Sequence, residues 1–284
     1  MSEHDCPLPQ HEPNAELTAS GAWQPSPFLS FSLLLHAGAV ASTLLIPESW
    51  PWAAGAVAAD QGVITLAGLW PRSRLLGPNW TRLPLASATR GEVSITIDDG
   101  PDPEVTPWVL DFLDRHGAKA SFFCIGEQAR RYPALCRDIA ARGHDVENHS
   151  LRHRFDFAFS GYRGFLQELS AAQTVLTELS GSRPLFFRAP FGIRNPLLEP
   201  ALSRLGLRLA SWTRRGFDTR ETDPDKVAQR LLQGLGAGDI LLLHDGNIAS
   251  TADGQAVILR VLPRVLAALD EANLRSVSLR SALS

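Results

Sequence analysis

The chain has 284 residues, a formal net charge of -3 and 44% hydrophobic residues, which is enough for one large folded domain and a smaller addition. The near-balanced charge lacks the basic excess of nucleic-acid-binding proteins, so no nucleic-acid partner is expected. The three cysteines form neither an even disulfide set nor a spaced metal motif, and their number does not require an oxidising compartment.

The first part of the chain divides into a polar tail and two apolar stretches. Residues 1–26 are rich in Pro and Glu and lack Lys and Arg, which indicates a disordered tail. Residues 28–46 carry no formal charge apart from a possible one at His36, and these 19 residues are about the number that crosses a bilayer as a helix. A second apolar stretch, residues 52–70, is interrupted by Asp60.

Three structures fit the two apolar stretches: a membrane hairpin, a signal peptide, or two helices of a soluble core. A signal peptide normally has a basic start and a shorter apolar segment, and this N-terminus has no Lys or Arg. We therefore predict two transmembrane helices within residues 27–71, followed by a linker over residues 72–90. Asp60 makes the second span the weaker one, because a carboxylate is costly in lipid unless it is buried against the partner helix.

The charges that flank the predicted hairpin indicate its orientation. No Lys or Arg precedes the first stretch, and four arginines follow the second: Arg72, Arg74, Arg82 and Arg90. By the positive-inside rule, the tail and the main domain then both lie on the cytoplasmic side of a bacterial-type inner membrane. If only the first stretch spans, the main domain lies on the other face.

Short β-like runs alternate with amphipathic helical runs between residues 91 and 284, and four of the helical runs end at a glycine. Seven strands are expected, centred on Ile95, Phe122, Val146, Phe186, Leu209, Leu241 and Val277. Helices are expected over residues 104–116, 128–142, 164–180, 195–205, 224–235 and 256–272. This alternation is typical of a barrel-like α/β domain with a parallel sheet.

Polar and titratable residues follow five of the predicted strands. In a barrel-like α/β domain the carboxyl ends of the strands carry the chemistry. The five segments are Asp98-Asp99-Gly100, residues 148–153, residues 188–192, Phe217-Asp218 and residues 242–246. Five polar strand ends after otherwise apolar runs are hard to attribute to turns alone.

Two histidines and two carboxylates among these segments indicate a metal site. His149 and His153 are four residues apart, so on a helical turn both imidazoles point to one side, as two ligands of one ion must. One added carboxylate gives a two-His, one-carboxylate site with open positions, which is typical of a catalytic metal. Asp98 and Asp99 can then divide the work, one binding the metal and the other accepting a proton.

Four motifs follow one another along the chain: Thr96-Ile97-Asp98-Asp99-Gly100, His149-Ser150-x-x-His153, Arg188-x-Pro190-Phe191-Gly192 and Leu242-Leu243-His244-Asp245. In order and spacing they resemble the motifs of the polysaccharide deacetylases, the NodB-homology or carbohydrate esterase family 4 enzymes. The resemblance covers about residues 91–282 and says nothing about residues 1–90. It implies that residues 91–284 form a catalytic domain with a distorted (β/α)7 barrel fold, here preceded by the hydrophobic helical hairpin.

The resemblance implies a metal ion and a general base near the end of the first strand. Asp99, His149 and His153 are implied to hold one divalent ion, usually Zn, with Co, Ni or Mn as other options. Asp98 is implied to be the general base that takes a proton from the attacking water. Arg188 looks like the family arginine that positions and tunes Asp98.

The later motifs imply the rest of the catalytic site. His244 would protonate the departing amine, and Asp218 would hold His244 and favour its imidazolium form. By the same analogy, the backbone N–H of Phe191 would lie near the oxyanion. Leu242 would line the pocket for the acetyl methyl group.

The sequence departs from the family pattern in two places. The family commonly has Asp-x-x-Asp-Trp after the fifth strand, whereas this chain has Arg215-Gly216-Phe217-Asp218-Thr219. The first Asp and the Trp are missing, which puts the usual aromatic wall of the acyl pocket in doubt. Glu147 stands where a small residue is more usual, so we expect it to narrow the site or add a polar contact. Six further residues are interpreted first as structural or surface residues: His116, His144, Asp245, Tyr162, Arg163 and Trp212. For Tyr162, Arg163 and Trp212, contact with the substrate is the less favoured alternative.

We therefore expect a membrane-anchored, metal-dependent hydrolase that removes an N-acetyl or other N-acyl group from an amino sugar of a glycan, peptidoglycan or lipid-linked saccharide. The expected partners are this substrate and, through residues 28–70, the membrane. A lipid-linked substrate suits a cytoplasmic site, because a polymer outside the cell cannot be reached from there.

Other functions fit the sequence less well. An O-acetyl esterase or a deformylase with the same site is the alternative. A non-catalytic glycan-binding module is less favoured because the base and all three metal ligands are present. A zinc protease is disfavoured because no Glu follows the first His in a His-Glu-x-x-His arrangement.

Overall fold

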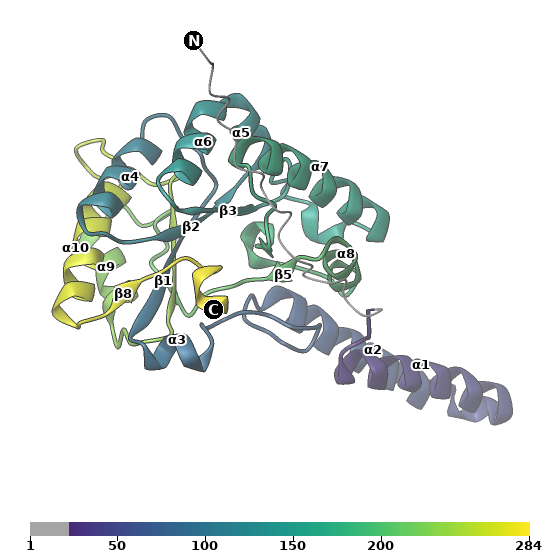
Figure 1. Ribbon diagram of the computed structural model, residues 1–284. Helices are drawn as coiled ribbons and strands as arrows, with labels where there is room; N and C mark the ends of the chain where they lie inside the picture. The colour runs from purple at the N-terminus through teal and green to yellow at the C-terminus, as the bar shows by residue number, and fades with distance from the viewer. Residues whose placement is uncertain (1–22) are drawn as a thin grey trace, which may run out of the picture.

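The structure, a computed structural model, describes residues 23–284, so most of the tail predicted over residues 1–26 lies outside the described residues. Its centre is a parallel β-sheet with the strand order β5-β4-β3-β2-β1-β7-β6, and β8 pairs with β1 (Figure 1). Because β5 and β6 are edge strands, the sheet is an open, curled barrel. The strands are β1 (Glu92–Asp98), β2 (Ala120–Cys124), β3 (Asp145–Asn148), β4 (Phe186–Phe187), β5 (Arg208–Leu209), β6 (Arg214–Arg215), β7 (Ile240–His244) and β8 (Arg275–Ser276).

The central strand β1 divides the interior into an apolar and a polar side. Side chains alternate along a strand, so Ile95 and Ile97 enter the apolar core under the helices. Thr96 and Asp98 face the other way, where both accept hydrogen bonds from Arg188. The sequence alternation of β1 therefore delivers a carboxylate to the barrel interior at the strand's carboxyl end.

Helices surround the sheet (Figure 1). They are α4 (Thr106–Arg115), α5 (Gly126–Arg131), α6 (Pro133–Ala141), α7 (Tyr162–Ser180), α8 (Leu198–Leu205), α9 (Pro224–Leu232) and α10 (Ile258–Glu271). Short 3₁₀ turns are η1 (Pro47–Ser49), η2 (Phe157–Phe159), η3 (Pro190–Gly192) and η4 (Ser281–Leu283). The single helix predicted over residues 128–142 is two helices, because Pro133 lacks an N–H to continue α5 and instead begins α6.

The described residues form eight strands where the sequence predicts seven. The additional strand is β6, which has only two residues, Arg214 and Arg215, and pairs with Leu241 and Leu242 of β7. Two arginines carry no β-type sequence pattern, so β6 exists because β7 offers it a free edge. The last strand, predicted around Val277, begins and ends slightly earlier as β8.

The N-terminal part forms an antiparallel helical hairpin that projects from the barrel (Figure 1). It consists of α1 (Pro27–Leu45) and α2 (Trp50–Leu69), joined through η1. Asp60 is 6% exposed and accepts a hydrogen bond of 2.5 Å from the Ser32 hydroxyl. Its carboxylate therefore lies between the two helices. This position shields the carboxylate from lipid, where an unpartnered one would be costly. Large apolar side chains on the hairpin are exposed, among them Leu33, Leu34, Leu44, Leu45, Trp50 and Trp52.

Within residues 23–284, one helix meets the length and hydropathy expected of a membrane span. This helix is α1, with a mean hydropathy of 1.7 and 11% of the span's residues buried. The low burial distinguishes α1 from the core helix of a soluble domain, although a signal sequence satisfies the same criterion. Helix α2 does not meet this criterion of length and hydropathy.

Residues 72–90, predicted as a linker, lie against the barrel over much of their length. The Trp80 N–H donates to Leu209 O at 2.9 Å, and Ser211 N–H donates to Trp80 O at 2.8 Å. Leu83 enters the apolar cluster inside the barrel. The segment then forms α3 (Leu85–Thr89) before β1. It thereby covers the open edge of β5 and connects the hairpin to β1.

Candidate active site

Asp98 and Asp99 are adjacent in sequence but have different partners. Asp98 is the last residue of β1, whereas Asp99 has a φ of 76° and begins a tight turn. A Cβ on Gly100 would lie 2.3 Å from Oδ1 of Asp245, so only glycine allows the turns after β1 and β7 to approach this closely. The Nδ2 of Asn247 donates to Oδ2 of Asp99 at 3.3 Å, which ties the two turns together.

The two predicted histidines meet at Asp99, although not from a helix. Residues 149–153 form an irregular loop, in which Ser150 and His153 have φ values of 65° and 51°. The Ser150 hydroxyl accepts a hydrogen bond from the His153 N–H at 2.9 Å, which closes the loop. The expected helical turn is therefore wrong, and a side-chain hydrogen bond brings the imidazoles together instead.

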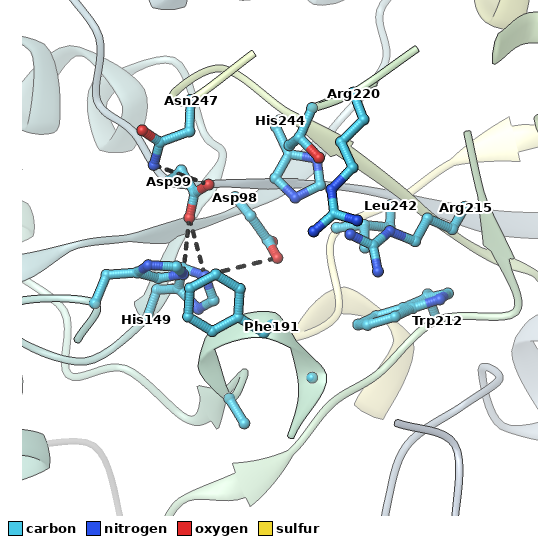
Figure 2. Close-up of a pocket in the computed structure, with 14 residues that line it drawn as sticks. Asp98, Asp99, His149, Phe191, Trp212, Arg215, Arg220, Leu242, His244 and Asn247 are labelled. Carbon is cyan, nitrogen blue, oxygen red and sulfur yellow. Dashed lines mark hydrogen bonds and ion pairs between the residues drawn. The ribbon is translucent and has the colours of Figure 1, made fainter. Parts of the chain in front are cut away.

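Asp99, His149 and His153 form a donor set that fits a divalent cation. Their ligand atoms lie within 4.8 Å of one another, and Oδ1 of Asp99 is buried without a hydrogen-bond donor. Both Nε2 atoms lie 3.2 Å from that oxygen (Figure 2). The Nδ1 of His149 lies 2.8 Å from Arg188 O, which accepts its proton and leaves Nε2 free as a ligand.

The charges of this set favour the forms that bind metals. Burial raises the pKa of Asp99, but close contact with His149 and the charges of both histidines outweigh it and hold that pKa well below its usual range. Burial and the neighbouring His149 lower the pKa of His153 to about 4. At neutral pH the set therefore offers an ionised carboxylate and a neutral imidazole, as metal coordination needs.

Arg188 fixes Asp98 from inside the barrel. Its Nη1 donates to Oδ1 of Asp98 at 2.7 Å and to Thr96 Oγ1 at 2.8 Å. Its other nitrogens donate to Ala210 O and Ser211 O at 3.2 and 2.9 Å. Burial lowers the pKa of Arg188, while Asp98 acts in the opposite direction. One carboxylate oxygen of Asp98 is thus held, and the other lies 3.9 Å from Nε2 of His149.

Asp218 holds His244 at the carboxyl end of β7. The Nδ1 of His244 lies 2.8 Å from Oδ1 of Asp218, and the backbone N–H of His244 donates to Oδ2 at 2.8 Å. Burial alone would lower the pKa of His244, but the charge and hydrogen bond of the fully buried Asp218 raise it to about 9. The imidazole is therefore a cation at neutral pH, with Nε2 available as a proton donor.

Asp98 and His244 line one pocket of about 330 Å³ together with the three candidate metal ligands (Figure 2). Phe191, Leu242 and Trp212 form its apolar wall. Phe191 has a φ of 58°, and the next residue, Gly192, leaves room for Trp212, which a Cβ there would approach to 2.7 Å. Asp218 and Arg188 lie behind the pocket rather than in its lining.

The structure also shows which residues the sequence analysis placed incorrectly or missed. Glu147 does not reach the pocket, because its carboxylate accepts from Leu185 N and Phe186 N and pairs with Arg280. Tyr162 and Arg163 also lie outside the pocket lining. The lining includes Trp212, for which substrate contact was the less favoured interpretation, and three residues that the sequence did not identify as site residues: Arg215, Arg220 and Asn247. The one sequence signal for these residues is the departure from the family motif at residues 215–219.

Comparison with known proteins places the chain in a family. A model of the polysaccharide deacetylase family matches residues 86–210. The chain is 34% identical over 158 residues to a chitooligosaccharide deacetylase of Azorhizobium caulinodans, which covers 55% of this chain and 75% of that relative. It is 30% identical over 170 residues to a peptidoglycan-N-acetylglucosamine deacetylase of Bacillus cereus, which covers 58% of this chain and 60% of that relative.

A solved structure shares the fold. A peptidoglycan N-acetylglucosamine deacetylase superimposes with a TM-score of 0.64 and 28% identity, over 72% of this chain and 92% of the other. An α/β-barrel hydrolase of carbon–nitrogen bonds is thus the class of protein expected from the sequence, and both fold and class are confirmed. The chain belongs to the polysaccharide deacetylase family.

Proposed function

We propose that this protein is a metal-dependent N-deacetylase of an amino sugar, held at a membrane by its N-terminal hairpin. The proposal rests above all on one observation: the ligand set of Asp99, His149 and His153 shares a pocket with Asp98 and His244. The relatives named above act on chitooligosaccharides and peptidoglycan. The substrate is accordingly an N-acetylated or otherwise N-acylated glycan, peptidoglycan fragment or lipid-linked saccharide.

Asp99, His149 and His153 would hold the ion. Two imidazoles and one carboxylate suit zinc, and Co, Ni and Mn accept the same ligands. A divalent ion at this position supplies Lewis acidity, which activates water and polarises an amide carbonyl. The buried Oδ1 of Asp99, which lacks a hydrogen-bond donor, supports this assignment.

Asp98 is proposed as the general base. Arg188 holds one of its oxygens at 2.7 Å, so the carboxylate keeps its orientation. The remaining oxygen can take a proton from the attacking water. An acid–base contribution of this kind accelerates a reaction by roughly 100- to 10,000-fold.

His244 is proposed as the general acid. An amide nitrogen leaves poorly without a proton, and the imidazolium held by Asp218 can supply one from Nε2. Both residues lie beyond residue 210, where the match to the family model ends, so these roles rest on the His244 motif and on the geometry of the pair. Leu242 and Trp212 would contact the methyl of the acyl group, and the backbone N–H of Phe191 would stabilise the oxyanion.

The hairpin supports a site close to a membrane. Its second helix, α2, is attached to the loop that follows η3, because Arg194 N–H donates to Gly68 O at 3.1 Å. Apolar side chains at the far end of the hairpin, including Leu45 and Trp52, are exposed. A hairpin inserted in the membrane would put the pocket near a lipid surface, on the cytoplasmic side if both helices span. A lipid-linked sugar is then within reach.

A substrate screen tests the proposed chemistry. Full-length protein in detergent is incubated with chitooligosaccharides, peptidoglycan fragments and lipid-linked N-acetyl sugars, and mass spectrometry follows the loss of acyl groups. We expect N-acyl loss that disappears in Asp98→Asn. Loss of O-acetyl groups alone would establish the esterase alternative, and a metal-loaded protein inert toward every N-acyl sugar would refute the proposal.

Reporter fusions test the membrane topology separately. A fluorescent protein and an alkaline phosphatase are each fused after Arg90. The proposed hairpin predicts fluorescence without phosphatase activity, because both reporters stay in the cytoplasm. Phosphatase activity without fluorescence would instead show that a single helix spans and that the domain faces outward.

A further inference from the structure

Two arginines in the catalytic pocket lack a counterion. Arg215 and Arg220 line the pocket beside His244 and Leu242, and Figure 2 shows both guanidinium groups directed into it. Among residues 23–284, neither guanidinium forms a hydrogen bond or an ion pair. The Nε of Arg215 is buried without a hydrogen-bond acceptor. The proposed deacetylation step uses neither side chain.

The carboxylates nearby are already paired. Three ion pairs account for them: Asp98 with Arg188 at 2.7 Å, Asp218 with His244 at 2.8 Å, and Glu221 with Arg230 at 3.1 Å. Asp99 belongs to the metal-binding set. Arg215 and Arg220 therefore add two positive charges without an ion-pair partner to one wall of the pocket.

Arg215 is held in place even though it lacks a polar partner. Its guanidinium carbon lies 5.4 Å from the centre of the Trp212 ring and 4.9 Å from that of Phe217. Its backbone is fixed by the pairing of β6 with Leu242 in β7. A half-buried cation without an anion is unfavourable, because burial removes hydrating water and no acceptor takes its place. An anionic ligand entering the pocket would supply the missing acceptor.

We propose that Arg215 and Arg220 bind a phosphate group carried by the amino-sugar substrate. The inference rests on the proposed deacetylase function and narrows its substrate class to phosphorylated N-acyl amino sugars. Guanidinium groups match the oxygens of a phosphate through paired N–H donors. Two such groups match the charge and the several oxygens of a phosphate, whereas one guanidinium is enough for a carboxylate.

The phosphate has two possible sources with the same chemistry. A sugar phosphate carries it at a free terminus, and a lipid-linked sugar carries it between the sugar and the lipid. Both place a phosphate within one sugar unit of the N-acyl group, where the pocket wall can reach it. The substrate panel below separates the two.

The experiment compares kcat/KM for matched substrates. The panel contains N-acetylglucosamine, its 1-phosphate, its 6-phosphate, a carboxylate-bearing analogue, and N-acetylglucosamine linked to a prenyl chain by phosphate. The full-length wild type is compared with Arg220→Gln and Arg220→Lys. Arg220 is exposed, so its replacement leaves the core intact. Arg163→Gln is the matched control, since Arg163 is an exposed arginine outside the pocket lining.

We expect the wild type to prefer a phosphorylated sugar over the neutral one by roughly 10- to 100-fold, as charge-assisted hydrogen bonds of this kind imply. In Arg220→Gln this preference falls by about tenfold, mainly through KM, because an affinity contact is lost. Arg220→Lys retains part of it, and Arg163→Gln retains all of it. Preference for the prenyl-linked sugar over the free phosphates identifies the lipid-linked source.

A direct binding measurement separates this inference from the proposed function. Calorimetry measures the affinity of the preferred sugar phosphate for the metal-loaded protein and its variants. Any contact of phosphate with the metal is present in the wild type and in every variant. It therefore cancels in the ratio of their affinities. If binding depends on Arg220 but no sugar is deacetylated, the anion site stands and the proposed function fails.

The reverse pattern overturns the inference while the proposed function stands. In that case neutral and phosphorylated sugars are deacetylated equally well, and Arg220→Gln changes neither their ratio nor the binding of sugar phosphate. A preference for the carboxylate-bearing analogue over every phosphorylated sugar would also overturn it, because the anion would then not be a phosphate.

Discussion

Nη1 of Arg188 lies 2.7 Å from Oδ1 of Asp98, and the two side chains are 1% and 4% exposed. A buried ion pair contributes little net stability when both partners are present, but loss of one partner leaves an unpaired buried charge. This relationship gives the first of five predictions.

Arg188→Met should destabilise the protein by about 3–5 kcal/mol, because the Asp98 carboxylate remains buried without its partner. Activity should fall by roughly 100-fold or more, since the proposed base loses its orientation. Chemical denaturation and steady-state kinetics measure the two effects. The double variant Asp98→Asn/Arg188→Met should be more stable than Arg188→Met alone, because the unpaired charge is gone. Equal stability of the two would contradict the pairing.

Asp98 and Asp99 should respond differently to the same substitution. Asp99→Asn should lose the divalent ion, because its carboxylate completes the ligand set with His149 and His153. Asp98→Asn should keep the ion and lose activity, because only the proposed base is gone. Metal analysis of the purified proteins measures the first effect and turnover the second. A metal-free Asp98→Asn protein, or an Asp99→Asn protein that keeps its ion, would reverse the two assignments.

The alkaline limb of the pH–rate profile should depend on Asp218. The proposed acid must be protonated, and Asp218 raises the pKa of His244 to about 9. Activity should therefore fall as pH rises through that region. In Asp218→Asn the pKa of His244 falls, because burial then dominates, and the limb moves to lower pH. A cation held by Asp99 would repel the imidazolium and lower the limb in both proteins. An unmoved limb would show that another group sets it.

The same shift predicts a stability change with a definite sign. The pKa of His244 is raised above its ordinary value of 6.5, so its contribution to stability is complete below pH 6.5 and is lost as pH rises through about 9. The contribution is on the order of 3 kcal/mol. Thermal denaturation of the wild type across this range, compared with Asp218→Asn, measures it, and the difference between the two proteins should shrink toward high pH.

The attachment of the hairpin should depend on Gly68. A Cβ there would lie 2.3 Å from Arg194 O, whereas a Cβ on Gly62 of the same helix meets nothing within 4 Å. Gly68→Val should therefore push α2 away from the loop that contains Arg194, lower the melting temperature and reduce activity. Gly62→Val is the control and should leave both unchanged. If the two variants behave alike, the contact does not support the site.

Much of the candidate site could be predicted from the sequence because strand ends share an edge. Asp98, His149, Arg188 and His244 each lie at or directly after the carboxyl end of a strand, and parallel strands bring such positions together. The order of the motifs was therefore enough to predict the family and the fold. The antiparallel hairpin was likewise readable, since two long apolar stretches with a short break have few other arrangements.

Other features depended on contacts between distant parts of the chain. The His149–His153 loop is irregular because the Ser150 hydroxyl closes it, and no periodicity in the sequence encodes that bond. The supposed linker covers β5 through Trp80, which has no distinguishing local pattern. The position of Glu147 near the carboxyl end of β3 predicts a site residue, but its carboxylate accepts a hydrogen bond from Arg280 instead.

The sequence by itself determined the strand-and-helix order, the candidate metal ligands and the division of Asp98 and Asp99 into two candidate roles, because these depend on local pattern and on strand polarity. Only the tertiary structure decided which residues form the wall of the pocket beside Leu242. A two-residue strand made of arginines has no intrinsic preference for a sheet, so β6 forms only where the edge of β7 is free. That pairing puts Arg215 beside Leu242 and makes one wall of the pocket cationic.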